Sequence, residues 1–251
     1  MRRAILYVCH GSRIVKAREE AIDFIKRCQN QVEADIQEIS FLELASPTIE
    51  EGFKACVEKG ASHVSVVPLL LLTAVHAKKD IPDEVQKCQE AYPWIKVKYG
   101  KPIGVHNKMA ESVMKKIHDA ASIDSSTVAI LIGRGSSDPD VTKDLGALAE
   151  LVYENSPLAD VRTCYLTAAS PSFSDTLESV KNTERNVIFI PYLLFTGLLM
   201  KGIEREISQT KNEHIILGDY LGYDPLVEEA FLDRVNETLC DKGELHAACH
   251  D

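Results

Sequence analysis

Short apolar runs alternate with amphipathic runs from one end of the chain to the other. The apolar runs are rich in Val, Ile and Leu, which is typical of strands buried on both faces of a parallel sheet. The amphipathic runs repeat their apolar residues at helical spacing, and one of them carries Ile22, Ile25, Cys28 and Val32 on one side. Strands that alternate with helices in this way predict βαβ units and an α/β fold.

The pattern predicts four strands and four helices in each half of the chain. In the first half, strands are expected at 3–9, 35–42, 63–69 and 95–99, and helices at 15–32, 48–59, 80–92 and 106–121. A polar linker at 122–126 follows. In the second half, strands are expected at 127–132, 161–167, 187–192 and 214–220, and helices at 141–153, 173–181, 201–210 and 225–239. Gly60 stands where a left-handed C-cap would end the second helix, and Asp80 is expected to open the third, with Pro82 in its first turn.

The two halves also resemble each other in sequence. Segment 5–12 matches segment 129–136 at an offset of 124, and Ala45-Ser46-Pro47 recurs as Ala169-Ser170-Pro171 at the same offset. Segment 68–74 recurs at 191–197 with an offset of 123. We therefore expect two homologous lobes, 1–122 and 123–251, each a four-stranded parallel sheet flanked by helices in the flavodoxin-like order 2-1-3-4. A cleft between the lobes is the expected place for a small-molecule site.

Composition narrows the class of protein. The 251 residues are 45% apolar and 26% charged, which argues against a disordered or low-complexity chain. A net charge of −10 argues against a general nucleic-acid or anionic-membrane surface. The seven cysteines form no C-x-x-C pair and are odd in number, so we expect reduced thiols and a cytoplasmic protein. The apolar segments near the N-terminus and at 64–74 are too short for a signal peptide or a membrane span.

Three chemically active side chains stand just past the first three predicted strands. They are His10, Glu43 and His76. In an open parallel sheet the ligand lies outside the carboxyl ends of the strands, and in the order 2-1-3-4 these three ends are neighbours. Two imidazoles and one carboxylate with open positions form the ligand set of catalytic Zn²⁺ sites and of non-haem Fe²⁺ sites. We therefore predict a reversible site for a divalent metal ion.

The second half of the chain acts as an internal control for this prediction. At the matching offsets His10 becomes Arg134, Glu43 becomes Thr167 and His76 becomes Leu199, while the apolar frame, the glycines and the prolines are kept. The frame therefore does not need these three side chains, and a single working site in the first lobe explains them.

Basic and hydroxyl side chains follow other predicted strand ends in this acidic chain. They are Ser12, Arg13, Lys78 and Lys101 in the first half and Arg134, Ser136 and Lys201 in the second. Together with backbone N–H groups at Gly-Ser turns and helix N-termini, they would form a local binding site for a polyanion. Each of them could equally be a solvated surface residue.

Other motifs carry less chemistry. There is no Walker A sequence, no G-x-G-x-x-G after the first strand and no G-x-S-x-G elbow. A His-Gly after the first strand invites comparison with histidine phosphatases, but those place Arg before the His, where this chain has Cys9. A bilobal protein that binds a small ligand without chemistry is a further alternative. Four other histidines are expected to be solvated or capping residues, and a tail with His246, Cys249 and His250 is expected to be a frayed terminus.

The motifs at these positions resemble those of the sirohydrochlorin chelatases of the SirB and CbiX type. The resemblance rests on the blocks at 8–13, 41–49, 68–82, 132–140 and 191–197. It covers nearly the whole chain and is strongest for the long, two-lobed form.

This resemblance implies a class II, ATP-independent chelatase without an organic cofactor that inserts Fe²⁺, or Co²⁺ in related enzymes, into sirohydrochlorin, a tetrapyrrole with eight carboxylates. His10 and His76 match the metal-site histidines of the family and Glu43 its nearby acid. One of these residues would also take the protons that leave the macrocycle. Because the chain carries both lobes, we expect a monomer.

Overall fold

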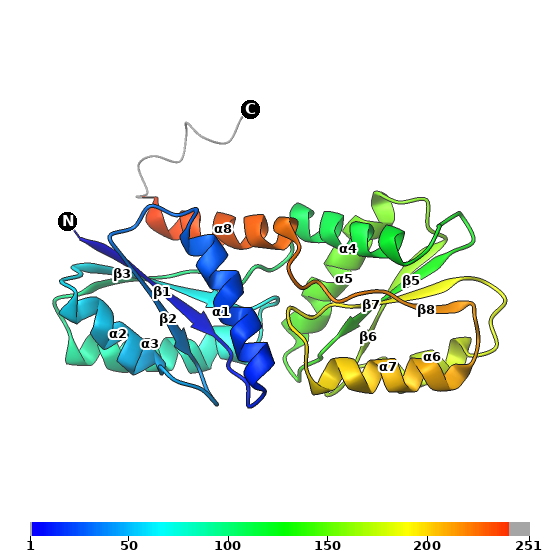
Figure 1. Cartoon of the computed structure of the whole chain (residues 1–251), viewed down its shortest axis with the longest axis horizontal. Coiled ribbons are helices and arrows are strands. Elements are labelled where there is room, and N and C mark those ends of the chain that lie inside the picture. The colour runs from blue at the N-terminus through cyan, green and yellow to red at the C-terminus, as the bar shows by residue number, and fades with distance from the viewer. Residues whose placement is uncertain (1, 241–251) are drawn as a thin grey trace. The chain divides into compact units, whose positions relative to one another are not determined.

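The computed structural model describes residues 2–240 and contains two four-stranded sheets (Figure 1). In the first half of the chain, the first set of elements comprises β1 (Arg3–Cys9), α1 (Val15–Gln29), β2 (Ile36–Phe41), α2 (Ile49–Glu58), β3 (His63–Leu69), the π-helical turn η1 (His76–Asp80), α3 (Ile81–Ala91), β4 (Lys96–Tyr99) and α4 (Asn107–Ala120). The second set comprises β5 (Val128–Gly133), α5 (Pro139–Glu154), β6 (Asp160–Tyr165), α6 (Phe173–Val180), β7 (Val187–Pro191), α7 (Leu198–Thr210), β8 (Ile215–Leu217) and α8 (Pro225–Leu239). Every predicted element is present.

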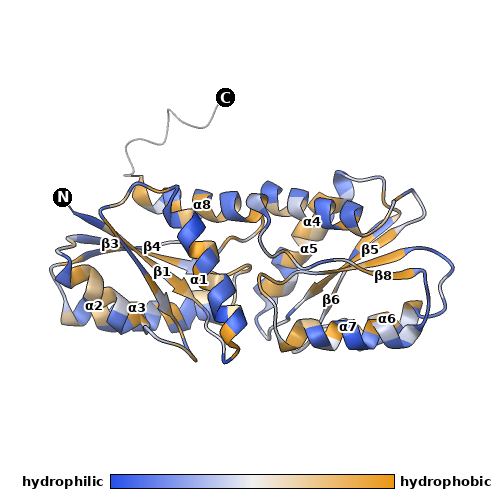
Figure 2. Ribbon diagram, viewed as in Figure 1, coloured by the Kyte–Doolittle hydropathy of each residue, from blue (hydrophilic) through white to orange (hydrophobic). Residues whose placement is uncertain are grey.

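All strand pairs are parallel, and their orders are β2-β1-β3-β4 and β6-β5-β7-β8. This confirms the predicted order in both halves. The two central strands β1 and β5 are buried along nearly their whole length because helices cover both faces of each sheet. In Figure 2 the helices are orange on one face and blue on the other, as expected for helices that pack one face against a sheet.

Local sequence signals explain where several helices begin and end. Thr48 and Glu51 form a reciprocal capping box at the start of α2. The helix ends just before Gly60, whose φ of +87° is the left-handed conformation expected there. Ser172 caps α6 in the same way that Thr48 caps α2, by accepting a hydrogen bond from the backbone N–H three residues on.

The start of the third helix differs from the prediction. Asp80 does not cap α3: its backbone is helical and its side chain makes no capping hydrogen bond. Instead a π-helical turn begins four residues earlier at His76 and leads directly into α3. The sequence pattern missed this turn because its residues precede the apolar periodicity by which we placed the helix.

The chain divides into two compact units that exchange helices. Among the described residues, unit 1 contains 2–103 and 228–240, and unit 2 contains 104–227. Helix α4, although it follows the first sheet, contacts α5 and β7, while Phe231 of α8 packs against Tyr7 and Phe24 of unit 1. The division therefore differs from the boundary at 122/123 that the linker suggested. A linker marks where the chain is polar, but packing determines which sheet an amphipathic helix covers.

Two further expectations concern the molecule as a whole. Among residues 2–240, no helix has the length and apolar content needed to span a bilayer. The cleft expected between the lobes stays a prediction.

Candidate metal-binding active site

The ends of β1 and β2 hold His10 and Glu43 side by side through the backbone. The ladder between these strands continues past their last residues, because Leu42 N donates to Cys9 O (2.8 Å) and Glu43 N donates to His10 O (3.1 Å). Gly11 makes this approach possible: its φ is +97°, and a Cβ built there would lie 1.8 Å from the carbonyl oxygen of Glu43. Only glycine fits at this position.

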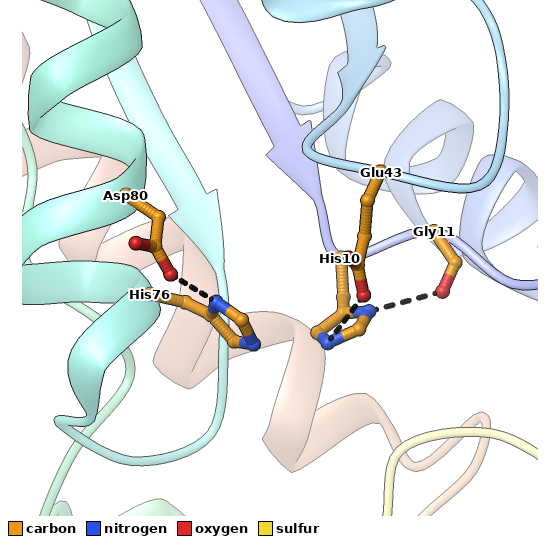
Figure 3. A network of polar contacts seen from close by, with 5 residues as sticks. All are labelled: His10, Gly11, Glu43, His76 and Asp80. Carbon is orange, nitrogen blue, oxygen red and sulfur yellow. Dashed lines mark hydrogen bonds and ion pairs between the residues drawn. The ribbon is translucent and has the colours of Figure 1, made fainter.

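The side chains of His10 and Glu43 face each other across this junction (Figure 3). Nε2 of His10 lies 3.6 Å from Oε1 of Glu43, and Nδ1 of His10 lies 3.1 Å from the carbonyl oxygen of Gly11. Because a carbonyl oxygen only accepts, Nδ1 carries the hydrogen in the neutral ring and Nε2 keeps its lone pair. Two acceptors, an imidazole nitrogen and a carboxylate oxygen, therefore face each other. Such a pair favours a cation between them.

His76 comes to the same place from the end of β3 and the following turn. Its ring centroid lies 4.8 Å from that of His10, with an interplanar angle of 83°. Its Nδ1 lies 2.7 Å from Oδ2 of Asp80, and Figure 3 shows its other nitrogen directed toward the His10 ring. The strand order thus brings together the three residues that we predicted from strand ends. Asp80 was missed as a site residue, although its i, i+4 spacing from His76 on a helical turn could have revealed it.

The distances fit part of a coordination sphere. Two ligands bound to one ion at about 2.1 Å with tetrahedral angles lie about 3.4 Å apart, close to the 3.6 Å between His10 Nε2 and Glu43 Oε1. Within residues 2–240, no three His, Cys, Asp or Glu side chains lie in positions from which they could hold one metal ion together. The rings of His76 and His10 meet edge to face. For His76 to bind the same ion as His10 and Glu43, side chains have to rotate. Shared binding by all three stays a prediction.

The thiol beside His10 does not belong to this group. Cys9 is buried, and burial raises the pKa of its thiol to about 12. Because the thiolate is the metal-binding form, this side chain stays protonated and inert. Cys9 thus belongs to the packing of β1.

Comparisons with known proteins bear on this arrangement. The CbiX family model matches the chain twice, at residues 4–120 and 128–238. The chain belongs to the CbiX family. It is 47% identical to the sirohydrochlorin ferrochelatase of Bacillus subtilis over the full length of both chains.

Two further relatives of this CbiX-family protein are informative. The solved structure of SirB from Bacillus subtilis with Fe³⁺ has a TM-score of 0.90 at 46% identity and covers 95% of this chain and 96% of its own. The sirohydrochlorin cobaltochelatase of Priestia megaterium is 32% identical over 98% of this chain and 83% of its own. The chain is thus similar to chelatases named for iron and for cobalt, with higher identity to the iron enzyme. The expected family is confirmed.

The double match of the CbiX model agrees with the duplicated backbone at the strand ends. In unit 2, Thr167 N donates to Arg134 O at 3.1 Å, the same distance as in unit 1. Gly135 repeats the role of Gly11, since a Cβ there would lie 1.8 Å from the carbonyl oxygen of Thr167. The second copy of the CbiX fold keeps the junction but carries no imidazole or carboxylate on it. At this junction the two copies differ in their side chains alone.

The other predicted binding residues lie at strand ends and in the turns that follow them. The hydroxyl oxygens of Ser12 and Ser136 accept hydrogen bonds from the backbone N–H groups two residues on. Arg13, Lys78 and Lys101 are exposed in unit 1, and Arg134 and Lys201 are exposed in unit 2. Lys78 lies in η1 and Lys201 in the first turn of α7, whereas the others lie in loops. Contact of any of them with a ligand stays a prediction.

Three of the remaining histidines have structural partners. His63 contacts Ser62, His214 contacts Asn186, and His106 accepts a hydrogen bond from Lys108 N at the start of α4. These contacts fit capping or surface roles. His246, Cys249 and His250 lie outside the described residues.

Proposed function

We propose that this chain is a sirohydrochlorin ferrochelatase, which inserts Fe²⁺ into sirohydrochlorin to give siroheme without ATP or an organic cofactor. The observation that carries this proposal is the meeting of His10, Glu43 and His76 at the carboxyl ends of β1, β2 and β3, in the one unit of the duplicated frame that keeps them. The full-length similarity to a ferrochelatase supports the choice of substrate.

The reaction needs both a metal holder and a proton acceptor. When Fe²⁺ enters the macrocycle, two pyrrole N–H bonds break, four nitrogen–iron interactions form, and two protons leave. Nε2 of His10 and the carboxylate of Glu43 can accept protons at the point where the ion enters. The same groups can thus hold the ion and take up the protons that it displaces.

The open arrangement of the ligands suits an ion that has to be released. A closed four-ligand site retains its metal, whereas two imidazoles and one carboxylate leave exchangeable positions. The three side chains are all partly exposed. We infer that the site binds Fe²⁺ with moderate affinity, as insertion requires.

Two exposed aliphatic side chains adjoin metal-site residues in sequence, and a third lies at the start of α1. Leu44 follows Glu43 and is 46% exposed, Val75 precedes His76 and is 42% exposed, and Val15 at the start of α1 is 55% exposed. Leu44 has a φ of +60°, a conformation that is costly for a leucine. We infer that these side chains contact a face of the macrocycle.

Cationic side chains would hold the carboxylates of the macrocycle. Arg13, Lys78 and Lys101 in unit 1, and Arg134 and Lys201 in unit 2, are the proposed partners, with Ser12 and Ser136 at the Gly-Ser turns. Charge-assisted hydrogen bonds of this kind are about twice as strong as neutral ones.

A second candidate function is the insertion of Co²⁺ in cobalamin biosynthesis. It is favoured by the 32% identity to a cobaltochelatase over nearly the whole chain. The ligand set does not discriminate, because its affinity for both ions follows the Irving–Williams order. We place iron first because the ferrochelatase is 47% identical.

We further infer a cytoplasmic monomer. Six cysteines within residues 2–240 are free thiols, which fits a reducing compartment. The family model matches twice within this one chain, so a second copy is not needed to supply the other half of the fold.

The test is anaerobic incubation of the protein with sirohydrochlorin and Fe²⁺ or Co²⁺, followed by absorbance. We expect insertion by the wild-type protein and its loss in His10→Ala and in His76→Ala, with folding intact because unit 2 folds without either histidine. His118→Ala, which removes an exposed histidine of α4, is the matched control and should insert metal normally.

Full turnover by both site variants would refute the site. Tight binding of sirohydrochlorin without a spectral change on adding metal would favour a binding protein, and hydrolysis of a generic phosphate ester would favour a phosphatase.

A further inference from the structure

Asp80 makes a short hydrogen bond to the outer nitrogen of His76. Oδ2 of Asp80 lies 2.7 Å from Nδ1 of His76, and both side chains are about one third exposed. A carboxylate only accepts, so the hydrogen lies on Nδ1 and the lone pair on Nε2. Figure 3 shows Asp80 on the far side of the His76 ring from His10, so the hydrogen bond holds the ring with Nε2 directed inward.

A π-helical turn sets up this pair. The N–H of Ile81 donates to the carbonyl oxygen of His76, five residues back. The next carbonyl, that of Ala77, would pair with residue 82, but Pro82 has no N–H to give. The hydroxyl of Tyr99 at the end of β4 donates to this carbonyl instead, at 3.0 Å. The turn that carries both His76 and Asp80 is therefore satisfied by a residue of the neighbouring strand.

Unit 2 lacks the whole arrangement. The buried residues of α7 are Met200, Ile203 and Ile207, so three positions separate the first two. The matching buried residues of unit 1 are Ala77, Ile81 and Val85, and there four positions separate the first two. Unit 1 thus contains one extra residue in this turn.

The residues of unit 2 that correspond to this turn carry no equivalent groups. Leu199 replaces His76, and the counterpart of Asp80 is Gly202 or Ile203, depending on which side of the extra residue the two helices are aligned. By strand register, Leu217 replaces Tyr99. The fold does not require the turn, and it occurs only beside the site that has the imidazoles.

We propose that Asp80 is a positioning residue that fixes the tautomer and orientation of His76 so that Nε2 is presented to the metal ion. The proposal rests on the proposed function, because it takes His76 to be a metal ligand. Partners of this kind around metal-binding histidines change metal affinity or activity by about 10- to 100-fold. We expect the removal of Asp80 to weaken metal binding within that range.

The first measurement reads the tautomer of His76 directly in the metal-free protein. Nitrogen-15 NMR of the histidine side chains, assigned with His76→Ala, should show the hydrogen on Nδ1 in the wild-type protein. In Asp80→Ala the Nε2–H form should become populated, because the acceptor is gone. Asp83→Ala removes an exposed carboxylate from the first turn of α3 and should leave the His76 signals unchanged. An unaltered tautomer in Asp80→Ala would overturn the proposal whatever the enzyme does.

The second measurement is titration with Co²⁺ alone, followed by its visible absorption. We expect Asp80→Ala to bind about 10- to 100-fold more weakly than wild type, Asp83→Ala to bind like wild type, and Asp80→Glu to recover part of the loss. Wild-type affinity in Asp80→Ala would count against the positioning role. If His76→Ala also binds Co²⁺ like wild type, the metal site itself is wrong, and this result separates failure of the proposed function from failure of the role of Asp80.

Discussion

At the scale of single residues, the two histidines of unit 1 present the same nitrogen to the site. Nδ1 of His10 contacts the carbonyl oxygen of Gly11, and Nδ1 of His76 contacts Asp80. Both contacts leave Nε2 with a lone pair, and Glu43 brings its carboxylate to 3.6 Å from Nε2 of His10. A backbone carbonyl and a carboxylate outside the proposed ligands thus determine which nitrogen each histidine offers. The chemistry of the site depends on these outer contacts as much as on the presence of two imidazoles.

Substitution of Glu43 by Gln separates proton transfer from binding. The amide keeps the size and polarity of the side chain but is a far weaker base than the carboxylate. We expect the rate of metal insertion at saturating sirohydrochlorin to fall by about 100-fold, within the range for loss of a general base. The affinity for sirohydrochlorin, measured by fluorescence quenching without metal, should change little. A variant with the wild-type insertion rate across pH 6 to 9 would remove the proposed role of Glu43 as a base.

At the scale of elements, the site depends on how strands end. The β1-β2 ladder runs past both strands because Gly11 lets the Glu43 backbone come close, and the same junction recurs at Gly135 in unit 2. The end of β3 differs between the units, since only unit 1 follows it with a π-helical turn. The glycine junction belongs to the duplicated frame, and we infer that the π-helical turn serves the proposed metal site.

Substitution of the two glycines by alanine tests this division. Gly11→Ala and Gly135→Ala each force a Cβ against a backbone carbonyl at positive φ, so we expect each to lower the free energy of unfolding by about 2 kcal/mol or more. Chemical denaturation should reveal similar losses. Co²⁺ titration should show weaker binding only in Gly11→Ala, because only that junction carries metal-site side chains. Equal loss of Co²⁺ binding in both variants would contradict the assignment of the site to unit 1.

At the scale of the whole molecule, each compact unit is completed by a helix from the other half of the chain. Unit 1 receives most of α8. Glu228 of this helix pairs with Arg27 of α1, and Thr238 lies against Ser65 and Gly100. Unit 2 receives α4, where Lys115 pairs with the buried carboxylate of Asp224. The duplicated halves are therefore not two independent modules joined by the linker at 122–126.

Division of the chain at the linker should yield a fragment that does not fold. Residues 1–122 lack the part of α8 that covers Tyr7 and Phe24, and they carry α4 without α5 and β7. We expect this fragment to lack the sharp amide spectrum of a folded protein and to bind a hydrophobic dye. Addition of a peptide of residues 225–240 to a fragment of residues 1–103 should restore folded signals, because it supplies the missing helix. A stable, dispersed spectrum for 1–122 alone would contradict the importance of the exchange.

Most of the fold could be read from pattern and spacing. Strands β1 and β3 and helix α8 have the predicted bounds, the strand order is the predicted one, and the repeat pointed to two sheets. These features depend on alternating hydrophobicity and on turn residues such as Gly60, which are local properties of the chain. The juxtaposition of His10, Glu43 and His76 followed from one topological rule applied to strand ends.

The tertiary structure alone decided three other features. It paired His76 with Asp80, which the sequence had suggested only as a helix cap, because the π-helical turn depends on a hydroxyl supplied by Tyr99 from another strand. It placed α4 in unit 2 and most of α8 in unit 1. The apolar face of an amphipathic helix does not by itself specify which sheet the helix covers. It also set the distance between His10 and Glu43, which depends on a backbone approach that only Gly11 permits. Spacing along the chain identifies elements and candidate groups, but contacts between distant residues determine their partners and orientation.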